Sequence, residues 1–451
     1  MEMKDSIDFG GMNLGKLFRK LLLPTLVGMV FSAIFVITDG IFVGHGIGSD
    51  ALAAVNITAP LFTISTGIAL MFGAGGAVVA SIHLSRGKRR TASINMTQAV
   101  AGCAILMGVL SITVMALRDE VLVFLGSSER LMPLAKEYLE WFTPFLPCLT
   151  ILTAGTYFVR MDGAPRYAMM CNVTAAVINI ILDYVFIFPL GWGMFGAALA
   201  TSLGYVVGAM MIIYYLWRRG KEVRFTRIKM SRKSLKLTLR NIGYMCNMGF
   251  SSLLSEGAIS CMMFVGNYVF MRHLGEDGVA AYSIVCYLFP IIFLAFNSVG
   301  QSAQPIWSFN YGKGDTERVQ AMLRMAMKAA VGGGIVIAVA LSVCRTGIVG
   351  MFLPPEAVAY GYAAEGLPLF ASGMIFCAVN IVLINYLQSI ERPAPANFIT
   401  LLRGYVLLVL TFVALPEITG STAGMWLAVP AAEALTCMVS IYFIVRGKRR
   451  R

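Results

Sequence analysis

Four carboxyl groups stand inside long apolar stretches of the sequence. They belong to Asp39, Asp183, Glu256 and Glu433. If those stretches cross a membrane, inserting one such group costs about 3 kcal/mol, and an ionisable residue in that position marks a functional site by default. The chemistry of this chain is therefore expected at these carboxyl groups.

Asp39 and Asp183 are expected to share a site with two polar neighbours. Counting 1.5 Å per helical residue, Asp39 lies roughly 27 Å along its stretch and Asp183 roughly 24 Å along its own. Asn179 precedes Asp183 by one helical turn, and Thr201 reaches a similar depth on the next stretch. Such hard oxygen ligands suit Na⁺. Two adjacent carboxylates that cannot both ionise also suit a carried proton, and the residues leave this choice open.

Glu256, Glu433 and Pro24 can each be interpreted as functional or as structural. Glu256 lies near the middle of its stretch, and Glu433 follows Met425 by eight residues. Either carboxyl group could serve function or could hydrogen-bond a neighbouring helix. Pro24 removes a backbone hydrogen bond early in the first stretch, which allows either a working kink or a static bend.

The composition requires a membrane around these residues. Of the 451 residues 58% are hydrophobic and 13% are charged, whereas a soluble domain has about a quarter charged residues. A span needs about 20 apolar residues, and the pattern predicts an all-α polytopic protein with twelve transmembrane helices. The predicted spans are 19–43, 52–80, 92–117, 134–158, 167–189, 194–217, 242–271, 279–308, 321–344, 362–389, 397–416 and 422–445.

The charge distribution predicts the orientation of these spans. The net charge is +13, and most Lys and Arg residues fall in every second connection, including 86–90, 218–240, 313–328, Arg392 with Arg403, and the tail 446–451. The positive-inside rule then places both termini in the cytoplasm, in a multi-pass protein of the cell membrane. Binding to nucleic acid is not expected. The spans also lack the nucleophile, acid–base and metal-ligand clusters of an enzyme.

The chain is predicted to consist of two related halves. Residues 1–217 would form one six-helix bundle, 218–240 a basic cytoplasmic linker, and 241–451 a second six-helix bundle. The segment 48–54 aligns with 275–281, and 196–200 aligns with 424–428, at offsets of 227 and 228 residues. An even number of helices gives both halves the same orientation, a repeat design found in secondary transporters.

These segments resemble one transporter family. Residues 38–44 with Pro24, 179–188 followed by 193–201, 300–312, and 388–392 followed by Leu402 and Arg403 are similar to MATE (multidrug and toxic compound extrusion) transporters. The similarity spans essentially the whole chain. It is nearest to the prokaryotic branch, which has an acidic pair in its N-terminal half.

The resemblance implies antiport by alternating access, with export of amphiphilic compounds, cationic ones among them, in exchange for H⁺ or Na⁺. It implies that Asp39, Asn179, Asp183 and Thr201 form the coupling site and that Pro24 bends the first helix. Glu256, Gln301 and Gln304 become candidates for a substrate site or a second cation site. No cofactor is implied beyond the coupling ion. The expected partners are a small-molecule substrate and the lipid bilayer, and the expected state is a monomer.

Some positions depart from the family pattern. Tyr184 stands where some relatives have proline, and Gln301 where some have a glutamate that favours cationic drugs. No acidic residue occurs around 377–380, where one subgroup has a cation ligand. The alternative function is a flippase for lipid-linked or glycan substrates in the same superfamily. A membrane-embedded enzyme and a channel are more distant alternatives.

Overall fold

A computed structural model describes the backbone of residues 7–228 and 231–449 and the side chains as far as Phe443. The basic residue Lys4 and the side chains of the tail 446–451, both predicted to be cytoplasmic, lie outside these described residues. Within them the chain is helical and contains no strand.

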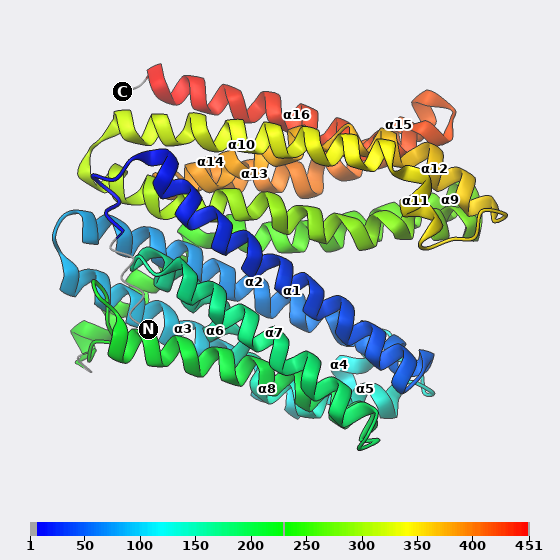
Figure 1. Cartoon of the computed structure of the whole chain (residues 1–451), viewed down its shortest axis with the longest axis horizontal. Coiled ribbons are helices and arrows are strands. Elements are labelled where there is room, and N and C mark those ends of the chain that lie inside the picture. Colours follow the sequence, from blue (N-terminus) through cyan, green and yellow to red (C-terminus); the bar gives the residue numbers. More distant parts are fainter. Residues whose placement is uncertain (1–6, 229–230, 450–451) are drawn as a thin grey trace. The chain divides into compact units, whose positions relative to one another are not determined.

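The first part of the chain folds into long helices joined by short turns (Figure 1). Their bounds are α1 Leu14–Gly46, α2 Ser49–Ser85, α3 Arg89–Ala116, α4 Arg118–Phe124, α5 Met132–Phe142, α6 Leu146–Met161, α7 Pro165–Ile187 and α8 Gly193–Tyr214. A short 3₁₀ turn joins α5 to α6, so that Met132–Met161 forms one membrane-length span. A π-helical turn, Tyr215–Arg219, ends α8.

The second part begins with the longest helix. The bounds are α9 Arg232–Lys313, α10 Thr316–Val343, α11 Arg345–Gly350, α12 Val358–Ala371, α13 Met374–Ser389, α14 Pro393–Leu401, α15 Leu407–Thr419 and α16 Thr422–Arg449. Gly275 breaks α9 with φ 65° and ψ −150°, a conformation that is essentially restricted to glycine. The helix α9 therefore comprises two passes, one before and one after Gly275.

The number of spans agrees with the prediction. In the described residues ten helices are long and apolar enough to cross a membrane, α9 being one of them. The pair α12 and α13, bent by 46°, adds one further span. Because Gly275 divides α9 into two passes, the total is twelve. The prediction of an all-α, twelve-helix membrane protein is thus confirmed.

The chain packs as two compact units. The first contains Met1–Leu253 and Ser308–Asp315, and the second contains Leu254–Trp307 and Thr316–Arg451. Both boundaries around 253 and 307 lie within α9. The predicted linker 218–240 includes the start of α9 at Arg232, and the division at this linker stays a prediction.

The beginning of the predicted linker, residues 221–223, is hydrogen-bonded to a buried side chain of the first unit. The buried carboxylate of Asp162 accepts hydrogen bonds from the backbone N–H groups of Lys221, Glu222 and Val223 at 2.7–2.9 Å. It also accepts one from the Tyr215 hydroxyl at 2.8 Å. Successive backbone N–H groups that point at one anion form a nest, so Asp162 fixes the chain that leaves α8.

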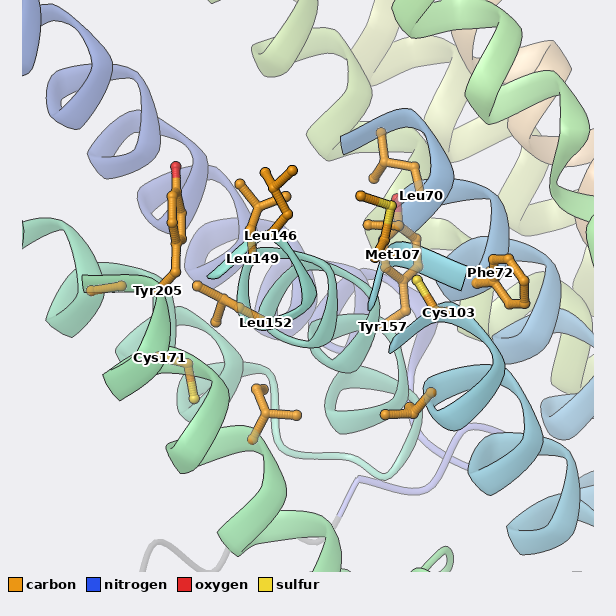
Figure 2. Packing of buried hydrophobic residues seen from close by; sticks show 14 of the residues in the cluster. Leu70, Phe72, Cys103, Met107, Leu146, Leu149, Leu152, Tyr157, Cys171 and Tyr205 are labelled. Carbon is orange, nitrogen blue, oxygen red and sulfur yellow. The ribbon is translucent and has the colours of Figure 1, made fainter. Parts of the chain in front are cut away.

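Small residues set the packing within the first unit, as the glycines of α2 lead one to expect. A side chain at Gly75 would strike the backbone of α9 at Met245, and one at Gly249 would strike the backbone of α2 at Met71. The two helices therefore touch backbone to backbone. Elsewhere in this unit large apolar side chains fill the space between helices, as Figure 2 shows for Leu149 and Leu152 beside Tyr205.

Candidate functional site

Helices α1, α7 and α8 pack against one another in the first unit (Figure 1), and the predicted carboxylate pair lies on two of them, α1 and α7. Asp39 is on α1, Asn179 and Asp183 are one turn apart on α7, and Thr201 is on α8. All four side chains are buried; Asn179 and Asp183 are 0% exposed and Asp39 is 9% exposed. Three separate segments of the sequence thus place polar groups at one point in an apolar bundle.

Hydrogen bonds connect three of the four residues in a short chain. The Asn179 amide Nδ2 donates to the Thr201 hydroxyl across 3.3 Å. That hydroxyl donates to Asp39 Oδ1 across 3.2 Å. Thr201 therefore links α7 to α1, and its proton points toward the Asp39 carboxylate.

Asp183 is the unusual member of the group. Neither of its carboxyl oxygens, nor Asn179 Oδ1, has a hydrogen-bond partner among the described residues, although all three atoms are buried. Its carboxyl group interacts electrostatically with Asp39. Burial beside a second carboxyl group disfavours a bare anion, and a proton or a bound cation would stabilise Asp183. The two carboxyl groups and the Asn179 oxygen supply acceptors for either.

Two tyrosines that sequence reasoning missed border the pair. Tyr138 on α5 and Tyr205 on α8 are both buried, and each interacts electrostatically with both carboxyl groups. Phe35 on α1 contacts the Tyr205 ring with centroids 5.6 Å apart. The signal was present in the sequence for Tyr205, which follows Thr201 by one helical turn, but nothing in the sequence connects Tyr138 to this site.

A close helix approach holds the site together. Gly204 stands on α8 where a side chain would lie 2.8 Å from the Ala175 carbonyl of α7 and 3.2 Å from the Asn179 Cβ. Since real Cβ atoms do not approach a carbonyl oxygen so closely, glycine is required at this contact. The glycine lets Thr201, one turn earlier, reach Asn179.

A second polar cluster occupies the interior of the second unit. Arg403 Nε donates to Glu433 Oε1 across 2.6 Å, and the two side chains are each 5% exposed. Asn380 Nδ2 donates to Glu433 Oε2 across 2.8 Å, and Ser440 donates to Asn380 Oδ1 across 3.2 Å. Arg403 also donates to the Cys377 sulfur and lies over the Phe293 ring, 5.7 Å from its centroid.

The position of Arg403 corrects the sequence interpretation. The charge pattern placed it with Arg392 in a cytoplasmic connection, but the structure buries it between α14 and α15. A π-helical segment, Leu402–Val406, carries it there. Such segments often occur at functional sites. The sequence identified Glu433 as a buried acid. It did not identify Arg403 as its partner, because an arginine next to a basic connection is normally counted among the cytoplasmic charges that set membrane orientation.

Among the described residues, none of the hydrogen bonds given above for the carboxylate pair involves the other predicted site residues. Glu256, Gln301 and Gln304 are on α9 within the second unit, and the two glutamines are buried. Among the described residues Glu256 has no hydrogen-bond or ion-pair partner, so no such contact joins it to the glutamines. Pro24 is buried inside α1, which continues as a helix to Gly46. The described residues contain no group of three or more His, Cys, Asp or Glu side chains that could hold a metal.

Comparison with known proteins gives consistent matches. The MatE family model matches residues 24–185 and 252–413, more than half of the chain. The second match begins and ends 228 residues after the first, which is the repeat offset seen in the sequence.

The matched relatives cover nearly all of the chain. The multidrug export protein MepA of Staphylococcus aureus is 23% identical over 430 residues, covering 94% of this chain and 92% of the relative. MepA of Staphylococcus saprophyticus is 23% identical over 427 residues, covering 93% and 92%.

Solved structures share the fold. One describes the outward-facing conformation of a multidrug resistance MATE family transporter of the MOP superfamily, with a TM-score of 0.89 and 22% identity over 100% of this chain and 98% of that one. A MOP superfamily transporter from Pyrococcus furiosus, described as having a binding pocket of reverse polarity, gives a TM-score of 0.87 at 22% identity with the same coverage.

Proposed function

The chain belongs to the MatE family of membrane transporters, and we propose that it is a secondary active antiporter that exports amphiphilic small molecules in exchange for H⁺ or Na⁺. The names of its relatives support drug export as the activity. The coupling ion and the exchange mechanism are proposed from the buried carboxyl pair.

The observation that carries this proposal is the state of Asp183. Both of its oxygens are buried inside the α1–α7–α8 bundle, and its carboxyl group lies beside that of Asp39. Occupation by a proton or by Na⁺ removes the uncompensated charge, and loss of the occupant restores it. The site can therefore exist in two states of different stability, which ion-driven transport requires.

The placement of the site suggests how occupancy would change the helix packing. Asp39 is on α1, whereas Asp183 and Thr201 are on α7 and α8. An ion or proton between the two carboxyl groups draws α1 toward α7, and its release lets them repel each other. Pro24 supplies a position in α1 where a missing backbone hydrogen bond eases bending.

The second unit is proposed to contribute to substrate binding through Glu256, Gln301 and Gln304. The unpartnered carboxyl group of Glu256 would attract a cationic group on a substrate, while the buried glutamine amides would select for hydrogen-bonding groups. The protein is proposed to act as a monomer in the cell membrane with both termini in the cytoplasm and with no cofactor.

Transport in proteoliposomes tests this function. Wild type should extrude a cationic dye when either an H⁺ gradient or a Na⁺ gradient is imposed, and the effective gradient identifies the ion. Asp39→Asn and Asp183→Asn should each abolish gradient-driven transport while the protein remains folded. Asp50→Asn removes an exposed carboxylate that pairs with Arg130 and should retain transport. Full activity of both buried-site variants would disprove the proposed coupling role.

A further inference from the structure

A groove on the second unit combines two unpaired cations with an apolar floor. It has a volume of about 800 Å³ and lies among α10, α13 and α16. Arg324 and Lys328 of α10 line it together with Gln320. We propose that this groove binds an anionic phospholipid, with the phosphate on Arg324 and Lys328 and the acyl chains on the apolar floor.

The helix arrangement explains why a groove exists here. The helix α13 packs against both α10 and α16, so the latter two flank it. Leu383 of α13 is buried at the bottom, and Leu323 of α10 is buried beside it. Ile441 of α16 is 51% exposed on the opposite wall. The surface between the flanking helices is therefore apolar and open to whatever surrounds the protein.

The spacing of the polar residues places them on one edge of this groove. Gln320, Arg324 and Lys328 follow one another at intervals of four residues, so their side chains form one stripe along α10. The amide of Gln320 is held by a hydrogen bond from its Nε2 to the Tyr386 hydroxyl of α13, at 3.1 Å. The stripe thus presents two positive charges and one fixed amide to the same space.

The two cations lack protein partners. Among the described residues neither Arg324 nor Lys328 makes a hydrogen bond or an ion pair. The only other charged lining residue is Glu317, in the first turn of α10, so the lining has a net positive charge. Elsewhere Arg89 pairs with Glu222 and Arg130 with Asp50. An external anion would give Arg324 and Lys328 a partner of opposite charge.

The depth of the stripe fits a phospholipid head group. Residues 329–343, directly after Lys328, contain no charged residue. At 1.5 Å per residue this apolar part of α10 spans roughly 22 Å, so Lys328 lies near the edge of the hydrocarbon layer and Arg324 one turn farther out. Phosphate groups of lipids occupy this level. A guanidinium can bind a phosphate through two N–H groups, and an ammonium adds a point charge.

Charge complementarity selects the occupant. A lipid with net negative charge gains from both cations, whereas a zwitterionic lipid brings its own ammonium group to the same place. Basic pockets between transmembrane helices are known to bind anionic head groups. The acyl chains would lie along the groove over the buried Leu323 and Leu383 and against the exposed Ile441.

Native mass spectrometry of the full-length protein tests this proposal directly. The protein, in detergent, is mixed with equal amounts of phosphatidylglycerol and phosphatidylcholine that have identical acyl chains. Wild type should retain phosphatidylglycerol at least tenfold more than phosphatidylcholine. Arg324→Gln with Lys328→Gln should remove this preference, and Arg324→Lys with Lys328→Arg should keep most of it.

A matched control removes two other exposed charges. Lys88→Gln with Arg90→Gln lowers the net charge by the same amount on the first unit, at two residues that do not line the groove, and should leave lipid retention unchanged. Equal loss in this control, or equal retention of both lipids by wild type, would overturn the proposal. Displacement of bound lipid by millimolar inorganic phosphate would also overturn it, because the acyl chains would then contribute nothing.

A second measurement covers the acyl contacts. Ile441→Gln places a polar amide on the apolar wall and should weaken retention of phosphatidylglycerol severalfold. A water-soluble glycerophosphate, which has no acyl chains, should not raise the melting temperature of wild type. Phosphatidylglycerol should raise that temperature for wild type and not for the double glutamine variant. This readout does not involve transport, so it stands apart from the proposed export activity.

Discussion

The guanidinium of Arg403 and the carboxylate of Glu433 form an ion pair of 2.6 Å in the interior of the second unit. Each charge would be costly there alone. Asn380 occupies the second carboxylate oxygen, and the Phe293 ring covers one face of the guanidinium. The net charge of the pair is zero, so the second unit keeps two ionised groups in its interior without an external ion.

Removing one partner of this pair should destabilise the protein more than removing both. Arg403→Met leaves Glu433 buried and unpaired, and Glu433→Met leaves Arg403 unpaired, each at a cost of about 3–5 kcal/mol. The double variant should recover most of that loss, because apolar groups of similar size can replace a buried ion pair. Thermal unfolding of purified protein in detergent measures the three changes. Additive losses in the double variant would show that the charges do not interact.

The hydroxyl of Thr201 should matter for coupling through its hydrogen bonds. Thr201→Val keeps the shape of the side chain but removes the donor to Asp39 and the acceptor for Asn179. We expect gradient-driven transport to fall about tenfold, the equivalent of one hydrogen bond to a charged group. Thr201→Ser keeps the hydroxyl and should retain most activity. Transport by the valine variant at the wild-type rate would remove Thr201 from the site.

Because α2 and α9 touch through their backbones, we expect alanine substitutions at Gly249 and Gly243 of α9 to have different effects on stability. Gly249→Ala puts a methyl group into the backbone of α2 at Met71, and we expect a loss of at least 2 kcal/mol in stability. Gly243→Ala lies six residues earlier in open space and should be neutral or stabilising by up to about 1 kcal/mol. The difference in melting temperature between the two variants is the measurement. Similar temperatures would mean that the helices separate easily.

The Asp162 carboxylate should stabilise the chain that follows α8. Asp162→Ala leaves three backbone N–H groups and the Tyr215 hydroxyl without their acceptor, and we expect a loss of about 2–3 kcal/mol. Limited proteolysis should then cut more rapidly near residues 221–226. Asp119→Ala, which removes an exposed carboxylate paired with Lys136, is the control and should change neither readout. Unchanged protease resistance in Asp162→Ala would show that other contacts hold this segment.

The sequence was sufficient for the spans and for most of the first polar site. Long apolar stretches and charge asymmetry report directly on membrane insertion, and isolated carboxyl groups such as Asp39 and Asp183 are conspicuous in them. The hydrogen-bond order through Thr201 was not predictable, since it depends on how closely Gly204 lets α8 approach α7. Tyr138 was missed because an aromatic residue in an apolar helix gives no sign of its neighbour across the bundle.

The second cluster shows a different limit of sequence reasoning. Arg403 stood inside the predicted span 397–416, and that position alone argued for a buried partner. The prediction nevertheless assigned Arg403 to a cytoplasmic connection, because the other basic residues follow that pattern. An arginine within a span needs a counter-charge at matching depth, and Glu433 was the available acid in the neighbouring helix.

The hydrogen bonds from residues 221–223 to Asp162 bear on where the chain can bend between the two units. Asp162 holds residues 221–223 and the start of α9 belongs to the first compact unit, so the chain passes from this unit to the second inside α9. Two of the crossings, near 253 and near 307, lie inside α9, and Pro305 stands two residues before the second, where its missing backbone hydrogen bond eases bending. A change in the angle between the units would therefore bend α9 at these crossings, and it would bend most easily at Pro305.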